Sequence, residues 1–262
     1  MIEINLERLT ILSRHPVLDQ VARDIARGVA VEDLPDQDII VCIGAHKRFA
    51  GLRHRQGFKI FVQTEHFFDA EGMPLWRKPI WFRTLVNLFL CDLILDLSSY
   101  NKTVYQWLPA RLRKKIVFGP RIFPSHPVRY AQGNGKVLFY GTINERRERL
   151  IKENSAFTTL ENEVFGSALE QSVAQASAVL NLHFVDARYT EYPRLLSAYL
   201  AGKPVVSDIL SPELVAGRHY LPLTASLNAE ALASAFEAFS VEFAAKNRFT
   251  DFLSRSVSPS DQ

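Results

Sequence analysis

The chain has 262 residues, 47% of them hydrophobic and 23% charged, which suits one large globular domain or two smaller ones. Its formal net charge of +3 is too small to predict a nucleic-acid-binding protein, and no long Lys/Arg tract is present. A mildly basic chain does suit an anionic substrate or an anionic membrane surface.

The cysteines and histidines predict neither disulfides nor a metal site. Cys42 and Cys91 sit in apolar segments without a CxxC motif, so we expect two buried thiols. No HxH or HExxH motif occurs, and the one DxD motif, Asp36-Gln-Asp38, precedes a predicted strand instead of following it. We therefore predict no metal and no cofactor.

The apolar segments do not predict a secreted or membrane-spanning protein. The N-terminus lacks a basic start and an apolar run, so no signal peptide is expected. Residues 80–97 are the most apolar stretch, but they include one Arg, one Asn and two Asp and are predicted to be a buried helix and strand. We expect a cytoplasmic location. Basic runs leave peripheral contact with the inner membrane face open; they lie at residues 53–55, 111–115 and 146–149.

The first half of the chain alternates strands with helices. The apolar run at residues 38–44 ends in glycine and is typical of a buried parallel strand. Ser98 is placed to cap a helix that ends near Leu108. Further strands are predicted at residues 58–63, 93–97 and 115–118, and a helix at residues 81–91.

A Pro- and Gly-rich stretch at residues 124–135 predicts a linker, after which the alternation restarts. Strands are predicted at residues 136–140, 163–165, 178–182 and 204–207, and helices at 145–153, 167–176, 193–201 and 228–246. This pattern predicts an α/β protein with two Rossmann-like, doubly wound domains that face a cleft. We place the domains at residues 1–130 and 131–250, followed by a disordered tail at 251–262.

The first candidate site follows the strand at residues 136–140. Gly141 forms a turn, and a helix that begins near Asn144 carries Arg146 in its first turn. Exposed N–H groups at a helix start can hold a phosphate, and glycine lets the phosphate approach the backbone. The alternative is a tight turn followed by a solvated, charged helix.

The second candidate site follows the strand at residues 178–182. His183, Glu191 and Arg194 cluster in the next loop and first helical turn, where ligands meet open α/β sheets. A carboxylate can accept hydrogen bonds from sugar hydroxyls, and Arg can bind phosphate. The segment therefore points to an anionic ligand, although a lone His is more often structural.

A third candidate is Glu65, at the carboxyl end of the strand at residues 58–63. It could line the cleft as a general base, or it could lie in a solvated loop. Residues 98–101 are most simply a helix cap, with ligand contact as the alternative.

At these residues the chain resembles glycosyltransferases of the GT-B fold, in particular bacterial glycosyl transferase group 1-like and spore-maturation-type members. The resemblance rests on Val62-Gln-Thr-Glu-His66 with residues 94–101, on residues 137–147, and on residues 180–208. It implies that residues 136–225 bind a nucleotide-sugar and that the N-terminal half holds a glycan or glycoconjugate acceptor. The implied activity is metal-independent sugar transfer in bacterial polysaccharide biosynthesis.

The resemblance also implies roles for individual residues. Glu65 and His183 would be catalytic, and the donor would be bound by Gly141, Asn144, Arg146, Glu191, Arg194 and Ser197. Where family members often carry a ribose-contacting Glu, this chain has Ser197, which is short and neutral. That departure keeps an inactive GT-B-like binding or scaffold protein as one alternative. A nucleotide-sugar epimerase is the other.

Overall fold

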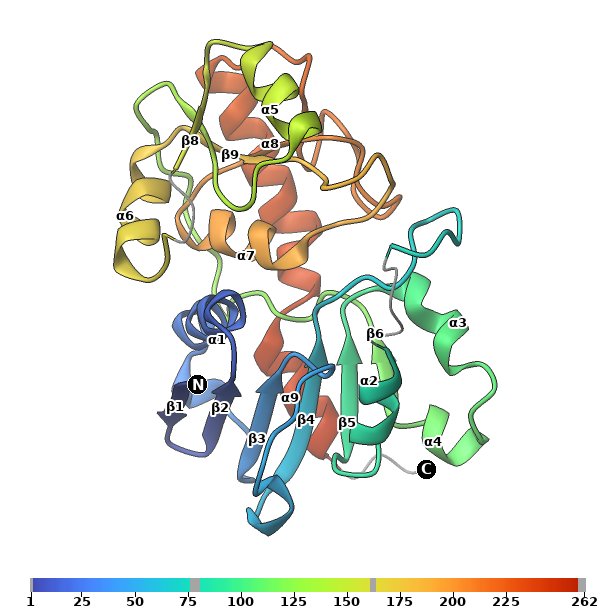
Figure 1. Cartoon of the computed structure of the whole chain (residues 1–262). Coiled ribbons are helices and arrows are strands. Elements are labelled where there is room, and N and C mark those ends of the chain that lie inside the picture. Colours follow the sequence, from blue (N-terminus) through green and yellow to red (C-terminus); the bar gives the residue numbers. More distant parts are fainter. Residues whose placement is uncertain (1, 76–80, 161–163, 259–262) are drawn as a thin grey trace. The chain divides into compact units, whose positions relative to one another are not determined.

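The computed structural model describes residues 2–75, 81–160 and 164–258, which form two compact α/β units (Figure 1). Unit 1 comprises Met1–His126 together with Asn247–Gln262, and unit 2 comprises Pro127–Lys246. Both sheets are wholly or mainly parallel. The predicted α/β class with two parallel-sheet domains is therefore confirmed.

Unit 1 contains a six-stranded sheet whose strands follow one another in sequence order. The first two strands form an antiparallel hairpin, and every later pair of neighbours is parallel. The strands are β1 (Ile2–Leu6), β2 (Leu9–Ser13), β3 (Ile39–Ile43), β4 (Phe58–Gln63), β5 (Leu93–Asp96) and β6 (Ile116–Phe118). All five residues of β3 are buried, as expected for an internal parallel strand.

Helices cover both faces of this sheet (Figure 1). One core cluster joins Leu85, Leu88, Val104 and Leu108 to strand residues such as Phe61. Leu85 belongs to α2 (Trp81–Asn87), which is drawn in front of the strands in Figure 1. The helices of unit 1 are α1 (Pro16–Gly28), α2 (Trp81–Asn87), α3 (Lys102–Tyr105), α4 (Ala110–Arg113) and α9 (Phe249–Val257), with 3-10 turns η1 (Val31–Asp33), η2 (Leu52–His54) and η3 (Ser99–Asn101).

Helix α9 corrects the prediction of a disordered tail at residues 251–262. It is drawn behind the strands of unit 1 in Figure 1, on the side away from α2. Phe249, Phe252 and Leu253 are at most 2% exposed, and the Phe249 N–H donates to the Phe123 carbonyl at 2.8 Å. These apolar residues recur at helical spacing, and their burial stabilises the helix despite the polar residues that follow them. Residues 259–262 lie outside the described part of the chain.

Unit 2 contains a five-stranded sheet with the spatial order β11-β10-β9-β7-β8. All its neighbouring strands are parallel. The strands are β7 (Val137–Phe139), β8 (Phe157–Thr159), β9 (Ala178–Asn181), β10 (Val205–Ser207) and β11 (Leu221–Pro222). The first strand, β7, therefore lies between β8 and β9, and the strand order reverses at this point. Such a reversal is the topological switch point at which open α/β sheets bind ligands.

The helices of unit 2 position the loops that follow these strands. Leu232 and Ala235 of α8 belong to a core cluster with alternate residues of β7 and β9, and Leu138 and Val179 point to the opposite face. The helices are α5 (Glu145–Lys152), α6 (Ser167–Gln175), α7 (Tyr192–Leu200), α8 (Ala229–Glu242) and the 3-10 turn η4 (Ala244–Lys246). The expected strand at residues 163–165 begins outside the described residues, and its last two residues are not in a strand.

The prediction of two buried thiols is confirmed. Cys42 and Cys91 are free and buried, as expected. No helix in the described part of the chain is long and apolar enough to cross a membrane. The same residues contain no group of three or more His, Cys, Asp or Glu that could hold a metal ion.

Candidate functional site

The candidate site lies in unit 2, at the carboxyl ends of β7, β9 and β10. Gly141 follows β7, His183 follows β9 and Asp208 follows β10 directly. Because the carboxyl ends of parallel strands meet at one sheet edge, these three loops are neighbours, and the switch point between β7 and β9 lies among them. The sequence-predicted residues of this unit are thus gathered at the edge where a ligand is expected.

Glu191 lies at the centre of the site between two arginines. Its Oε2 accepts from Arg194 Nε at 3.1 Å and Nη2 at 2.8 Å, and its Oε1 accepts from Arg147 Nη2 at 3.2 Å. Burial raises the pKa of Glu191, but the two arginines outweigh that effect, and the pKa lies below its ordinary value. Glu191 is therefore an anion at neutral pH and holds both arginines in place.

Arg147 is a structural member of this network. Its side chain is 6% exposed. It donates to the Leu182 carbonyl from Nε at 3.0 Å and from Nη2 at 2.6 Å, and to the Thr142 carbonyl from Nη1 at 2.7 Å. It thereby ties the loop after β7 to the end of β9. Arg147 was not among the predicted site residues, although it lies next to Arg146 in the same helical turn.

Arg194 lies against the loop after β7. Its Nη1 donates to the Tyr140 carbonyl at 2.6 Å, and its guanidinium lies 4.8 Å from the centroid of the Tyr140 ring. Its Nη2 lies 3.6 Å from the position that a Cβ at Gly141 would occupy. Gly141 is exposed and has a φ of 110°, which L side chains rarely adopt. The glycine therefore leaves open the space beside Arg194 for a group that approaches this turn.

Arg146 links the ends of β9 and β10. It donates to the His183 carbonyl from Nη1 at 3.0 Å, and its Nη2 lies 2.8 Å from Asp208 Oδ2. Its side chain is 23% exposed, more than that of Arg194 at 9%. Asp208 was not among the sequence-predicted site residues. Its position directly after a short buried strand is the same signal that identified His183.

Several buried polar atoms at this edge have no hydrogen-bond partner among the described residues. They are Nε2 of His183, Oδ1 of Asp208 and Oδ1 of Asn181. An unsatisfied buried polar atom costs about 1–3 kcal/mol, so such atoms require an explanation, and a ligand at this edge would supply one. Their position at the ends of β9 and β10 supports a ligand site.

His183 is buried and stacks on Tyr189, with the ring centroids 4.2 Å apart. Burial lowers its pKa, and Glu191 and Asp208 oppose that effect without reversing it. The Nδ1 atom lies 3.9 Å from Asp208 Oδ2. His183 is therefore neutral at pH 7 and presents an imidazole that can donate or accept a hydrogen bond.

Asn144 and Ser197 differ in their surroundings. Asn144 caps α5: its Oδ1 accepts from the Arg147 N–H at 3.0 Å, and its Nδ2 donates to the Phe184 carbonyl at 2.6 Å. Both the oxygen and the nitrogen of this side-chain amide are therefore hydrogen-bonded within the protein. Ser197 lies half-buried within α7, one turn beyond Arg194.

In unit 1 the structure brings Glu65 close to a network around Asp96. The Glu65 carbonyl accepts from Gln63 Nε2 at 3.0 Å and from Asn101 Nδ2 at 2.9 Å. Asp96 in turn accepts from Asn101 Nδ2 at 2.9 Å and from Tyr105 Oη at 2.8 Å. The network fixes the backbone at Glu65.

Asp96 is fully buried and has neutral hydrogen-bond donors. Burial raises its pKa to about 7, although the Ser98 N–H, Tyr105 and Asn101 favour the anion. Ser98 does not act as the predicted helix cap through its side chain. We therefore assign a structural role to the polar residues at 96–101: they hold the loop that contains Glu65 in place.

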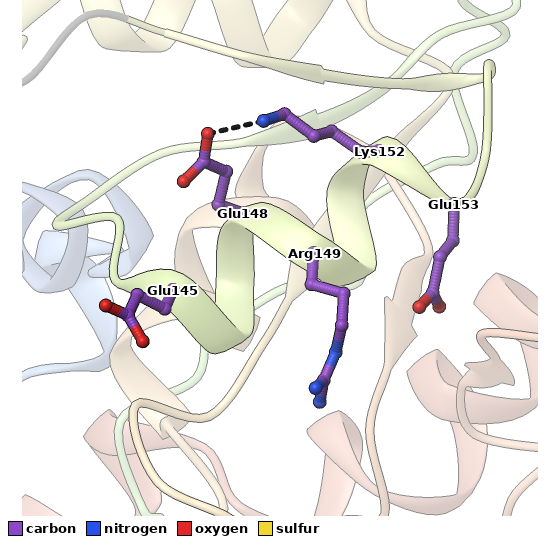
Figure 2. Close-up of a pocket in the computed structure, with 5 residues that line it drawn as sticks. All are labelled: Glu145, Glu148, Arg149, Lys152 and Glu153. Atoms are coloured by element: carbon purple, nitrogen blue, oxygen red, sulfur yellow. Dashed lines mark hydrogen bonds and ion pairs between the residues drawn. The ribbon is translucent and has the colours of Figure 1, made fainter.

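A surface hollow along α5 is lined by charged side chains of that one helix (Figure 2). Figure 2 shows them pointing to different sides of the helix, with Lys152 Nζ 2.6 Å from Glu148 Oε1. Exposed ion pairs of this kind contribute little, and the hollow has the character of a solvated helix face. It carries none of the candidate site residues, which lie at the sheet edge.

No protein-family model and no curated protein matches this chain. Solved structures do match. The GtfA/B complex bound to UDP and GlcNAc matches at 10% identity and a TM-score of 0.35, over 84% of this chain and 56% of that one. TarM matches at 12% identity and a TM-score of 0.40, over 90% and 54%. The chain thus spans about half the length of the solved structures that it resembles.

Proposed function

We propose that the protein is a glycosyltransferase that binds a nucleotide-sugar at the carboxyl edge of the unit 2 sheet and transfers the sugar without a metal. The observation that carries this proposal is the gathering of Gly141, Arg146, His183, Glu191 and Arg194 at the topological switch point. That edge combines cations, a hydrogen-bonding carboxylate and an open glycine turn. Diphosphate and sugar groups require such partners.

In the proposed complex the diphosphate lies over Gly141 and the first turn of α5. N–H groups of a first helical turn lack intrahelical partners and attract anions. Arg194 and Arg146 contact this edge and supply the positive charge that a metal would otherwise provide for the leaving diphosphate. Both arginines already pair with carboxylates, so a bound diphosphate would share them with Glu191 and Asp208.

The sugar and acceptor would be handled by the remaining predicted residues. His183, neutral at pH 7, donates a hydrogen bond to a sugar hydroxyl. The Glu191 carboxylate accepts hydrogen bonds from the nucleotide-sugar, and the Ser197 hydroxyl donates or accepts one. Glu65 acts as the general base for a glycan or glycoconjugate acceptor held by unit 1. The acceptor belongs to bacterial surface-polysaccharide synthesis.

The test compares two glycine variants. Gly141→Ala and Gly135→Ala place the same methyl group at positive φ, but residue 141 follows β7 and residue 135 precedes it. Calorimetric titration with UDP, GDP, ADP and CMP in EDTA identifies the nucleotide that binds the wild type. We expect Gly141→Ala to weaken that binding at least tenfold, because the methyl group occupies the phosphate position, and Gly135→Ala to leave it within twofold.

Equal weakening in both variants, or no nucleotide response from a folded wild type, would contradict the donor site. Nucleotide binding without transfer from any matching nucleotide-sugar would instead favour a GT-B-like binding protein. The specific observation behind that second reading is Ser197, which stands where a ribose-contacting carboxylate is common in the resembled family.

A further inference from the structure

We propose that unit 1 docks on anionic membrane surfaces through one face formed by α2, α3 and α4. This aromatic-basic face consists of four apolar and four basic exposed residues: Phe82, Val86, Phe89, Trp107, Arg83, Arg111, Arg113 and Lys114. The inference does not depend on the proposed donor site, which lies in unit 2.

The apolar part of the face is a stripe along α2. Phe82, Val86 and Phe89 are spaced at i, i+4 and i+7, so they share one side of the helix and its final turn. They are 64%, 46% and 74% exposed. Leu85 and Leu88 are buried in the core. Large aromatic residues at such exposure form an apolar surface that indicates an interaction site.

Trp107 and the basic residues lie beside this stripe. Lys115 lies two residues beyond the end of α4, and its Nζ donates to the Leu88 carbonyl at 3.2 Å and to the Cys91 carbonyl at 2.8 Å. Arg113 Nη1 donates to the Gln106 carbonyl at 3.4 Å, next to Trp107, which is 65% exposed. Figure 1 shows α2, α3 and α4 on the same side of the unit 1 sheet. Val104, Leu108 and Leu112 pack in the same core cluster as Leu85 and Leu88, so both groups lie on the outer side of one helical layer.

The charge of the face selects an anionic partner. Residues 81–115 contain six Lys or Arg and two Asp, an excess larger than the +3 of the whole chain. One of these acids, Asp96, is fully buried in the network described above. Aromatic rings insert at the headgroup level of a bilayer, and neighbouring Lys and Arg attract anionic headgroups. An anionic bilayer satisfies both parts of the face.

A second copy of the chain fits this face less well. In a two-fold dimer the same patch meets itself, so Arg111, Arg113 and Lys114 would oppose their own copies. Like charges across an interface are unfavourable. A bilayer presents the opposite charge and requires no shape match, so the charge pattern favours it.

The test is sedimentation of the full chain with vesicles of phosphatidylcholine alone or with about one third phosphatidylglycerol. We expect binding to the anionic vesicles only, with weakening at high salt. Phe82→Ser/Phe89→Ser and Arg111→Glu/Arg113→Glu should each reduce the partition coefficient at least tenfold. Matched controls are Val241→Ser, at a site 68% exposed in α8, and Arg149→Glu on the exposed side of α5.

Circular dichroism first confirms that each variant is folded. Absence of binding to anionic vesicles would overturn the proposal, as would equal binding by the face variants and the controls. Analytical ultracentrifugation without lipid separates the remaining case. Concentration-dependent association that Phe82→Ser/Phe89→Ser abolishes would assign the face to contact between copies of this chain, and that result would also overturn membrane docking.

Discussion

Both units carry a polar network at the carboxyl edge of their sheet, but the two networks differ in charge. In unit 2, Glu191 is paired with two arginines and Asp208 with a third. In unit 1, Asp96 is surrounded by the neutral donors of Ser98, Asn101 and Tyr105. Paired charges keep a carboxylate ionised when buried, and neutral donors only partly compensate its desolvation.

This difference gives the two buried carboxyl groups opposite effects on stability as pH changes. The pKa of Glu191 is lowered, so its contribution is present at neutral pH and is lost as pH falls through its folded pKa. The pKa of Asp96 is raised to about 7, so its contribution is present at low pH and is lost as pH rises through that value. The arginines of unit 2 stabilise ionised carboxylates, whereas the Asp96 network of unit 1 fixes a loop.

The largest expected effect is that of Arg147→Ala in unit 2. The substitution leaves Glu191 with one arginine and removes the donors from two carbonyls, those of Thr142 and Leu182. Loss of one partner from a buried ion pair costs about 3–5 kcal/mol. We expect the free energy of unfolding of unit 2 to fall by that amount in urea denaturation.

Arg149→Ala is the matched control because Arg149 is exposed on the same helix. An exposed substitution of this kind changes stability by about 0.5 kcal/mol or less. Equal effects of the two variants would show that Arg147 does not hold the loops at this edge.

The next largest effect is expected for Asp96→Asn in unit 1, on the pH dependence of stability. A pKa raised from 3.8 to about 7 means that the folded state binds this proton more tightly than the unfolded state. The difference in stability between variant and wild type should therefore shift toward the variant by up to about 4 kcal/mol as pH rises from 4 to 7.5. Urea denaturation across this range measures it.

The variant must be compared with wild type because His46 changes the stability of unit 1 with pH in the opposite direction. Burial lowers the pKa of His46 to about 4, so its contribution is lost as pH falls below 6.5. The wild-type profile of unit 1 is therefore flatter than either group alone would make it. A flat difference curve for Asp96→Asn would refute the raised pKa.

His183→Gln is expected to have a smaller effect, in unit 2. Burial lowers the pKa of His183, and Glu191 and Asp208 partly offset the shift. The folded state thus disfavours the protonated ring, and acidification below the unfolded pKa of about 6.5 destabilises unit 2. The variant should lose less stability than wild type between pH 7.5 and 5. Identical pH curves for His183→Gln and the wild type would exclude this role for His183.

The sequence predicts the elements whose signals are local. Continuous apolar runs located β3, β4, β5 and β9, and the turn residue Gly141 and the cap residue Asn144 marked the start of α5. The hairpin of β1 and β2 was not predicted, although Ile2–Leu6 alternates apolar with polar residues as a half-buried strand does. Its turn includes Glu7 at a φ of 46°, an unusual conformation for a residue other than glycine. The turn therefore lacks the glycine that would have marked it in the sequence.

Contacts between residues that lie far apart in the sequence are harder to predict. The contact between Arg147 and Leu182 joins residues 35 positions apart, and Arg194 reaches Tyr140 across 54 positions. The sequence placed Gly141, His183 and Arg194 at one sheet edge because they follow predicted strands, but it did not single out Arg147 or Tyr140. It could not show that Asn144 is occupied within the protein, or that α9 belongs to unit 1, because both depend on tertiary packing.

The smallest expected effect is that of Ser197→Ala on nucleotide affinity. A neutral hydroxyl contributes about 1 kcal/mol through one hydrogen bond, so we expect roughly fivefold weaker binding in calorimetry. Ser197→Glu provides the complementary change, because a carboxylate at this position could accept two ribose hydrogen bonds. If Ser197→Glu binds more tightly and Ser197→Ala more weakly, residue 197 faces the ribose. If neither substitution changes affinity, the ribose lies elsewhere, and the site depends on the network of Glu191 and its arginines.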